Sequence, residues 1–171
     1  MIAVSKPGLL ALLSFAMLGW LACEQQPAGP SGPAASEAGE LATDDPEAFL
    51  AAAAAVPGAQ KFPSGLVYLE VTPGTGDSPG ASDMVEVHYH GTLSDGSVFD
   101  SSVNRGTPAR FPLNRVIPCW TEGVQKMKVG GKSKLTCPAK IAYGERGSPP
   151  KIQPGAALAF DVELLGIIPS Q

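Results

Sequence analysis

The sequence predicts an α+β domain in which an antiparallel sheet of about five strands wraps around one short helix. Apolar and polar residues alternate in several short segments, which is the pattern of strands buried on one face. Clusters of turn-forming residues, mostly Gly and Pro, separate these segments. The spacing of one helix face occurs only once, between Pro118 and Gly130, so a single helix is available to cover the sheet.

Each expected strand lies in the domain that we place at residues 61–171. Met84–Gly91 is the clearest, because its apolar and polar side chains fall on opposite faces, with Tyr89 on the apolar one. Pro112 confines its own segment to a sheet edge or a bulge, since proline has no backbone N–H. The expected strands are Leu66–Val71, Met84–Gly91, Val98–Phe99, Arg110–Leu113, Lys132–Cys137 and Ala156–Gly166.

The predicted helix begins at Pro118, because proline is favoured in the first turn. Trp120, Val124 and Met127 then recur at the spacing of one helix face. Gly130 supplies the left-handed residue that commonly ends a helix. The helix should therefore present Trp120 to the sheet.

Residues 1–22 have the composition of a signal peptide. Lys6 is the only basic side chain there, and Leu9–Ala22 is a continuous run of apolar and small residues. The run is shorter than the ~20 residues of an ordinary membrane span but suits the apolar region of a signal peptide. We therefore expect export from the cytoplasm.

Cys23 directly follows this segment. Leu21-Ala22-Cys23 is similar to a bacterial lipobox, whose cysteine is lipidated after cleavage. We expect Cys23 to anchor the protein to a membrane of the bacterial envelope. Glu24 favours the outer membrane, facing the periplasm, because it is not the Asp that retains lipoproteins at the inner membrane. Ordinary cleavage nearby, leaving Cys23 as a free or paired thiol, stays open.

Residues 23–60 are expected to form a flexible tether with one short helix. From Glu24 to Pro46 large apolar side chains are scarce, so little surface can be buried to offset the entropy of ordering. Asp44–Glu47 predicts a helix start, and Ala48–Ala55 would continue it for about two turns. Such a helix is too short and too weakly patterned to pair two chains, so we predict a monomer.

Cys119 and Cys137 remain as an even pair if Cys23 carries lipid. In an oxidising compartment such a pair can form a disulfide. Two buried thiols are the alternative, because free cysteine is a common core residue.

Charge and histidine content exclude several classes of function. A net charge of −4 and a pI near 5.1 argue against a nucleic-acid partner, which needs a basic surface. The two histidines, His88 and His90, share one short strand, so we expect neither a metal site nor a hydrolytic catalytic set. No cofactor is expected.

Aromatic residues are spread along the domain beside turns or on alternating strands. Any one of them could be an ordinary core residue. Asp100, however, places a carboxylate beside the ring of Phe99, and the loop of Tyr143 is rich in Gly and Pro, as exposed functional loops often are. These features favour a functional role for the whole set, which is Tyr89, Phe99, Trp120, Tyr143 and Phe160.

Five segments of the domain carry ordered motifs: Val87–Gly91, Gly96–Ser102, Val116–Gly123, Ala142–Gly144 and Phe160–Leu165. In their order and spacing they resemble the FKBP-type peptidyl-prolyl cis-trans isomerases. The resemblance covers about Gly65 to Ile168 and is closest to the bacterial periplasmic and macrophage-infectivity-potentiator branch.

This resemblance implies an enzyme that rotates X-Pro bonds in proline-containing proteins folding outside the cytoplasm. Asp100, Tyr143 and Tyr89 would be its polar catalytic residues, and Trp120 would form the floor of the pocket. The other substrate-binding residues would be apolar: Phe99, Phe111, Val116, Ile117, Ile152 and Phe160.

Two positions depart from the family's pattern at the rim of the pocket. Ala109 replaces an aromatic residue of many relatives, and Lys151 stands where an apolar residue is common. With Ser148–Pro150, which also differ, they imply a more open or more polar flap and weaker binding of the family's macrolide inhibitors. They also motivate an alternative function, a non-catalytic periplasmic chaperone or peptide-binding module that uses the same pocket.

Overall fold

The computed structural model describes residues 43–168. The predicted signal peptide, the lipidation site Cys23 and the first part of the predicted tether lie outside the described residues. Within residues 43–168, no helix has both the length and the apolar character of a membrane span.

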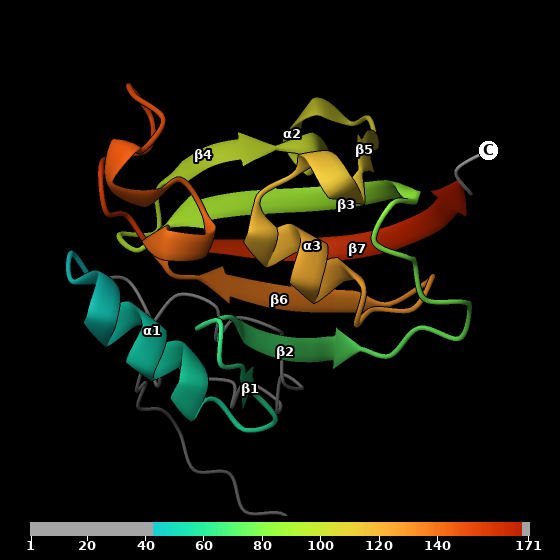
Figure 1. The fold of residues 1–171 in the computed structure, drawn as a ribbon, viewed down its shortest axis with the longest axis horizontal. Helices are drawn as coiled ribbons and strands as arrows, with labels where there is room; N and C mark the ends of the chain where they lie inside the picture. Colours follow the sequence, from blue (N-terminus) through green and yellow to red (C-terminus); the bar gives the residue numbers. More distant parts are fainter. Residues whose placement is uncertain (1–42, 169–171) are drawn as a thin grey trace, which may run out of the picture. The chain divides into compact units, whose positions relative to one another are not determined.

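The described chain forms one antiparallel sheet of seven strands, in the order β1-β2-β6-β7-β3-β4, with β5 paired to β3 (Figure 1). The predicted fold class is confirmed, but the strand count is higher than the five expected. The strand that was not expected is β1, which is too short to show alternation. The segment expected at a sheet edge or a bulge, Arg110–Leu113, corresponds to β5, which pairs with β3. The strands are β1 (Gln60–Lys61), β2 (Val67–Thr72), β3 (Met84–Leu93), β4 (Val98–Ser101), β5 (Ala109–Pro112), β6 (Lys132–Cys137) and β7 (Leu158–Ile168).

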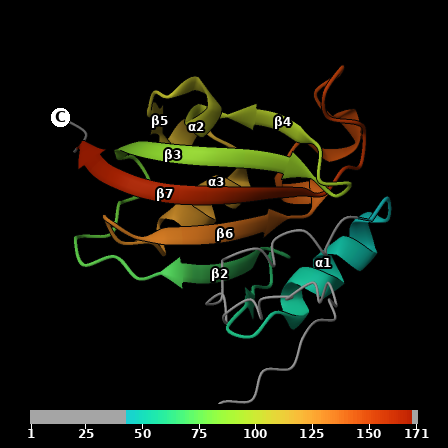
Figure 2. The same ribbon diagram turned by 180° about the vertical axis from the view of Figure 1, so that it is seen from behind.

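The two longest strands, β3 and β7, pair along their whole length at the centre of the sheet. Val85, Val87 and Tyr89 of β3 are buried, whereas His88 and His90 are partly exposed on the opposite face. The alternation in the sequence therefore predicted correctly which face of β3 meets the core. Figure 2 shows this opposite face of the sheet, with α3 behind it.

The helix α3 (Pro118–Val124) lies across the inner face of the sheet (Figure 1). It begins at the predicted proline but ends before the predicted Gly130. After Val124 the chain continues in tight turns, in which Lys126 and Met127 donate backbone hydrogen bonds to residues three positions earlier. Met127 is still fully buried, so its spacing correctly indicated burial although the backbone is not helical.

Close packing of α3 on the sheet depends on Gly123. A Cβ atom at this position would lie 2.8 Å from a methyl carbon of Leu135 on β6. Only glycine allows the helix to approach β6 so closely. The apolar interior formed between α3 and the sheet is continuous and includes Leu66, Leu113, Val124, Leu135, Leu158 and Leu164.

The helix α1 (Pro46–Ala55) corrects the predicted extent of the tether. Its N-terminus is capped by Asp45, which accepts a hydrogen bond from Glu47 N at 3.0 Å. Phe49 and Leu50 are buried in a small cluster with two alanines of β7 and the loop before it, Ala157 and Ala159. Since these contacts hold α1 against the sheet, residues 43–60 belong to the folded domain and not to a flexible tether.

Two further helical elements frame the region where the site lies. The short helix α2 (Ser102–Arg105) follows β4 directly and is capped by Ser101, which accepts from Asn104 N. The 3₁₀ turn η1 (Leu113–Arg115) connects β5 to α3. Two more 3₁₀ turns, η2 (Ala139–Ile141) and η3 (Gly144–Arg146), lie in the long loop between β6 and β7.

Candidate functional site

A cavity of about 380 Å³ opens between α3, the sheet and the long β6–β7 loop. Nine of the ten predicted catalytic and substrate-binding residues line it, although they come from six different parts of the chain. The lining residues are Tyr89, Phe99, Asp100, Phe111, Arg115, Val116, Ile117, Trp120, Tyr143 and Phe160. Ile152 is the predicted residue that does not line the cavity. Arg115 lines it but was not predicted from the sequence.

Trp120 is central to this cavity and is 4% exposed. The rings of Tyr89, Phe111 and Phe160 lie 5.4, 5.6 and 5.4 Å from it, all nearly perpendicular to the indole plane. Such edge-to-face contacts are the favoured arrangement of aromatic rings. Among the described residues, the Trp120 Nε1 is the buried side-chain donor that has no hydrogen-bond partner. Packing, and no side-chain hydrogen bond among the described residues, therefore holds the indole in place.

Phe99 reaches the cavity because Gly91 leaves room for it. A Cβ atom at Gly91 would lie 2.6 Å from the Phe99 Cζ. The Phe99 ring also meets the edge of Phe160 at a centroid distance of 5.5 Å. The glycine that ends the Val87–Gly91 motif is thus required by the aromatic wall.

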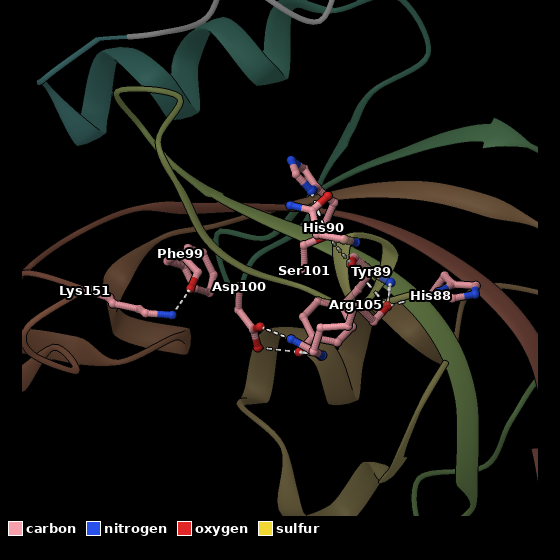
Figure 3. Close-up of polar contacts among 10 residues, drawn as sticks. His88, Tyr89, His90, Phe99, Asp100, Ser101, Arg105 and Lys151 are labelled. Atoms are coloured by element: carbon pink, nitrogen blue, oxygen red, sulfur yellow. Dashed lines mark hydrogen bonds and ion pairs between the residues drawn. The ribbon is translucent and has the colours of Figure 1, made fainter. Parts of the chain in front are cut away.

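Asp100 is part of a polar group with Tyr89 and Arg105 (Figure 3). The Tyr89 hydroxyl donates to Asp100 Oδ2, and one Arg105 nitrogen donates to Asp100 Oδ1. The other terminal nitrogen of Arg105 donates to the Tyr89 hydroxyl at 3.0 Å. Arg105 lies in α2, outside every motif singled out in the sequence, and nothing in its local pattern indicated this role.

These bonds determine the ionisation of the group. Burial opposes the charge of Asp100, but the hydrogen bonds from Tyr89 and Arg105 outweigh it and lower the pKa of this carboxyl. Burial raises the pKa of Tyr89, and its hydrogen bond to Asp100 raises it further. The site therefore holds an ionised Asp100 beside a protonated Tyr89.

Tyr143 stands at the beginning of η3 and is about one-third exposed. Burial raises the pKa of its hydroxyl, and the negative charge of Asp100 adds to this effect. None of the hydrogen bonds among residues 43–168 involves this hydroxyl. It is thus a protonated donor at the edge of the cavity.

The loop after Tyr143 corrects the predicted place of Ile152. This side chain is 4% exposed in the core and does not line the cavity. Its backbone forms a small bridge with Ser148, through two hydrogen bonds of 2.8 and 3.1 Å. The neighbouring Lys151 reaches across to β4, where Nζ donates to the Phe99 carbonyl at 2.7 Å (Figure 3).

Cys119 and Cys137 form a disulfide with their Cα atoms 5.9 Å apart. Both residues are completely buried. Cys119 precedes Trp120 in α3, whereas Cys137 ends β6 just before the loop that carries Tyr143. The bond therefore ties the floor of the cavity to the strand that leads into its polar loop.

His88 and His90 lie on the outer face of β3 and bond to serines. The His88 Nδ1 lies 3.2 Å from Ser102 Oγ, and the His90 Nδ1 lies 3.0 Å from Ser101 Oγ. Within residues 43–168 no group of three His, Cys, Asp or Glu side chains is close enough to hold a metal ion.

A second cavity of about 370 Å³ lies between α1 and the loops that contain Gly65, Lys140 and Gly155. It contains none of the predicted site residues and no aromatic side chain. Charged groups from Glu47 and Lys61 contribute to its walls. The aromatic cavity is therefore the better candidate for a binding site that favours apolar ligands.

Comparison with known proteins assigns the sheet and cavity to one family. Residues 76–165 match the family described as FKBP-type peptidyl-prolyl cis-trans isomerase. The chain is 57% identical over 121 residues to the Aeromonas hydrophila FKBP-type peptidyl-prolyl cis-trans isomerase FkpA, covering 71% of this chain and 45% of that protein. It is 45% identical over 121 residues to the outer membrane protein MIP of Legionella longbeachae, covering 71% and 52%.

A crystal structure of a peptidyl-prolyl cis-trans isomerase from Pseudomonas syringae is similar with a TM-score of 0.68 and 39% identity. That alignment covers 72% of this chain and 90% of the other. The two curated relatives are longer, since this chain spans about half of their length.

Proposed function

Because the chain belongs to the FKBP-type peptidyl-prolyl cis-trans isomerase family, we propose that its aromatic cavity catalyses rotation about X-Pro peptide bonds. The observation that carries the proposal is the position of Trp120. Its indole lines a cavity together with three aromatic rings that contact it edge to face, and the same cavity contains one ionised carboxylate, Asp100. Rotation breaks no bond, so such a cavity needs neither a nucleophile nor a metal ion.

Resonance in the planar amide creates a barrier of ~18–20 kcal/mol to this rotation. Twisting the bond removes the resonance, which makes the amide less polar and the proline nitrogen more amine-like. A cavity with apolar walls therefore disfavours the planar amide more than the twisted one, and this difference lowers the barrier. Val116, Ile117 and the rings around Trp120 provide these walls.

The polar residues have separate roles in this scheme. The Tyr143 hydroxyl, kept protonated by its raised pKa, donates a hydrogen bond to a carbonyl of the bound peptide. Asp100 stays ionised through Tyr89 and Arg105, so it orients and polarises the cavity and does not transfer a proton. No step requires a cofactor.

The substrates we propose are proline-containing proteins that fold after export. The signal-peptide pattern of residues 1–22 supports export, and the pattern at Cys23 supports a lipid anchor. The relative named as an outer membrane protein, from Legionella longbeachae, is consistent with the bacterial envelope as the location. An anchor in the outer membrane facing the periplasm and a monomeric state complete this proposal.

The test is exchange NMR on a short X-Pro peptide with the full chain. We expect the cis-trans exchange rate to rise with added wild-type protein and to fall by at least tenfold with the Tyr143→Phe, Trp120→Ala double variant. Tyr68→Phe is the matched control, because the Tyr68 hydroxyl bonds Ser133 in the core, away from the cavity. Equal rates for wild type and the double variant, with both folded by circular dichroism, would contradict the proposal.

The alternative function, a non-catalytic peptide-binding module, was motivated by Ala109 and Lys151. Neither residue is among those that line the cavity. Ala109 packs against the core, and Lys151 bonds the backbone of β4. Nothing in the described residues therefore favours this alternative over catalysis.

A further inference from the structure

We propose that Arg115 makes the site selective for substrates with a carboxylate side chain beside the X-Pro bond, an inference that rests on the isomerase function proposed above. Arg115 is the one cationic residue that lines the aromatic cavity of the described chain. No carboxylate of residues 43–168 lies within 4.0 Å of its guanidinium. A substrate carboxylate would be its first close counter-ion.

The other charges at the cavity do not neutralise Arg115. Asp100 is the only carboxylate in the lining, and Arg105 already neutralises it with a direct ion pair. Glu122 lies on α3 but outside the lining. Lys151 adds a second cation at the edge, where its ammonium contacts the Phe99 carbonyl. The entrance of the cavity is therefore net positive although the whole chain carries a net charge of −4.

The backbone that carries Arg115 is firmly held, so its side chain extends from a fixed point. Leu113, two residues earlier in η1, is completely buried, and its N–H donates to the Asp83 carbonyl at 3.0 Å. The Thr121 hydroxyl of α3 donates to the Leu113 carbonyl at 2.7 Å. Val116 and Ile117 follow directly as cavity walls. A peptide that touches these walls lies within reach of the guanidinium.

Elementary electrostatics sets the size of the effect. The Arg115 side chain is exposed, and exposed ion pairs are weak because water screens them. We therefore expect a preference of roughly two- to fivefold for a Glu side chain over the isosteric but neutral Gln. Salt should reduce this preference, because the Debye length falls from ~10 Å at 0.1 M to ~3 Å at 1 M ionic strength.

The experiment compares peptides that differ only at the residue before or after proline, with Glu, Gln, Leu or Lys at that position. Exchange NMR gives kcat/KM for each peptide with the full chain, without a coupling protease that has preferences of its own. We expect the Glu-to-Gln ratio, which is kcat/KM for the Glu peptide divided by kcat/KM for the Gln peptide, to be about two to five in wild type at one of the two positions. It should fall to about one in Arg115→Gln and in 1 M NaCl. Arg115→Glu should instead favour the Lys peptide.

Arg110→Gln is the matched control. It removes the same charge from β5, but Arg110 pairs with Glu86 at 3.0 Å and does not line the cavity. Its Glu-to-Gln ratio should equal that of wild type. A ratio that is the same in wild type and in Arg115→Gln, at both positions, overturns the role of Arg115.

Failure of the isomerase function gives a different result. In that case no peptide, charged or neutral, exchanges faster with any of the proteins. Binding of the same peptides, followed through the NMR signal of the Trp120 indole N–H, still reports the Glu-to-Gln ratio. A binding ratio unchanged by Arg115→Gln would then overturn the selectivity independently of catalysis.

Discussion

Lys151 Nζ donates a hydrogen bond to the Phe99 carbonyl at 2.7 Å and so joins the β6–β7 loop to the strand that supplies the aromatic wall. Phe99 is held from two sides, since its ring rests on Gly91 and its backbone accepts from Lys151. Lys151 is therefore a bridge between two segments of the site.

Replacing Lys151 by Met keeps most of the side-chain length and removes the ammonium. We expect the Ser148 and Ile152 amides, which bond each other's carbonyls, to exchange with solvent roughly three- to tenfold faster, because one hydrogen bond contributes about 0.5–1.5 kcal/mol. Hydrogen exchange followed by NMR measures this. Lys128→Met is the control, as Lys128 is exposed and makes no side-chain hydrogen bond within the described chain. Equal exchange in the two variants would show that the bridge does not hold the loop.

The stability contributed by Asp100 should depend on pH. Its pKa is lower in the folded protein than in the unfolded chain, so ionised Asp100 stabilises the fold above the ordinary value of about 3.9. This contribution is lost as the pH falls through the lower, folded pKa. We therefore expect wild type to exceed Asp100→Asn in stability at pH 7 and to lose that advantage progressively as the pH falls below about 3.9. Urea unfolding at pH 7, 4 and 2.5 tests this.

The control for this series is Asp44→Asn, which changes the net charge equally at an exposed residue that has no side-chain hydrogen bond among the described residues. Its difference from wild type should vary little with pH. A difference between wild type and Asp100→Asn that stays constant from pH 7 to 2.5 would mean that Tyr89 and Arg105 do not favour the ionised form.

Gly91→Ala should displace the Phe99 ring from the wall of the cavity. The added methyl would lie 2.6 Å from the Phe99 Cζ, so the ring must move away from its place against Phe160. Overpacking of this kind costs about 1–3 kcal/mol. We expect a comparable loss in urea unfolding and a fall in kcat/KM of at least tenfold. Gly166→Ala on the neighbouring strand β7 is the control, because no atom lies within 4 Å of the added Cβ. Similar losses in both variants would contradict the steric argument.

The Cys119–Cys137 disulfide should stabilise the domain by about 3 kcal/mol. The two residues are separated by 18 positions, and loops of about this length lose roughly that much free energy in the unfolded state when they are closed. Urea unfolding of the Cys119→Ala, Cys137→Ala double variant against oxidised wild type gives the value. Because both sulfurs are buried, we also expect reductant to act on the native protein only after unfolding. Rapid reduction at zero urea, detected by thiol alkylation and mass, would contradict this.

Local patterns predicted much of the sheet, because the alternation of apolar and polar residues in a strand can be recognised from a few consecutive residues. Val85, Val87 and Tyr89 are buried as their spacing indicates, and Pro118 begins α3. The helix ends earlier than predicted, at Val124, and the turns that follow it still bury Met127. The spacing of apolar residues therefore predicts which side chains are buried, but it does not predict the backbone conformation of the segment that carries them.

The parts that could not be predicted depend on contacts between distant segments. Arg105 meets the Tyr89 hydroxyl only because α2 folds back beside β3, and Arg115 meets the cavity only after η1 packs on α3. The docking of α1 depends on the small side chains of Ala157 and Ala159, more than one hundred positions later in the chain. The sequence of α1 alone does not distinguish a flexible tether from a docked helix, because the surface that buries Phe49 and Leu50 comes from a distant part of the chain.

The disulfide also determines what a protease would leave behind. It closes a ring of chain that contains the exposed residues Lys126, Lys128 and Gly130, which lie in the tight turns between α3 and β6. A single cut in these turns would separate the polypeptide into two pieces that remain covalently linked through Cys119 and Cys137. The nicked molecule would keep Trp120 from one fragment and Tyr143 from the other within a single particle, and it would fall apart only under reducing, unfolding conditions.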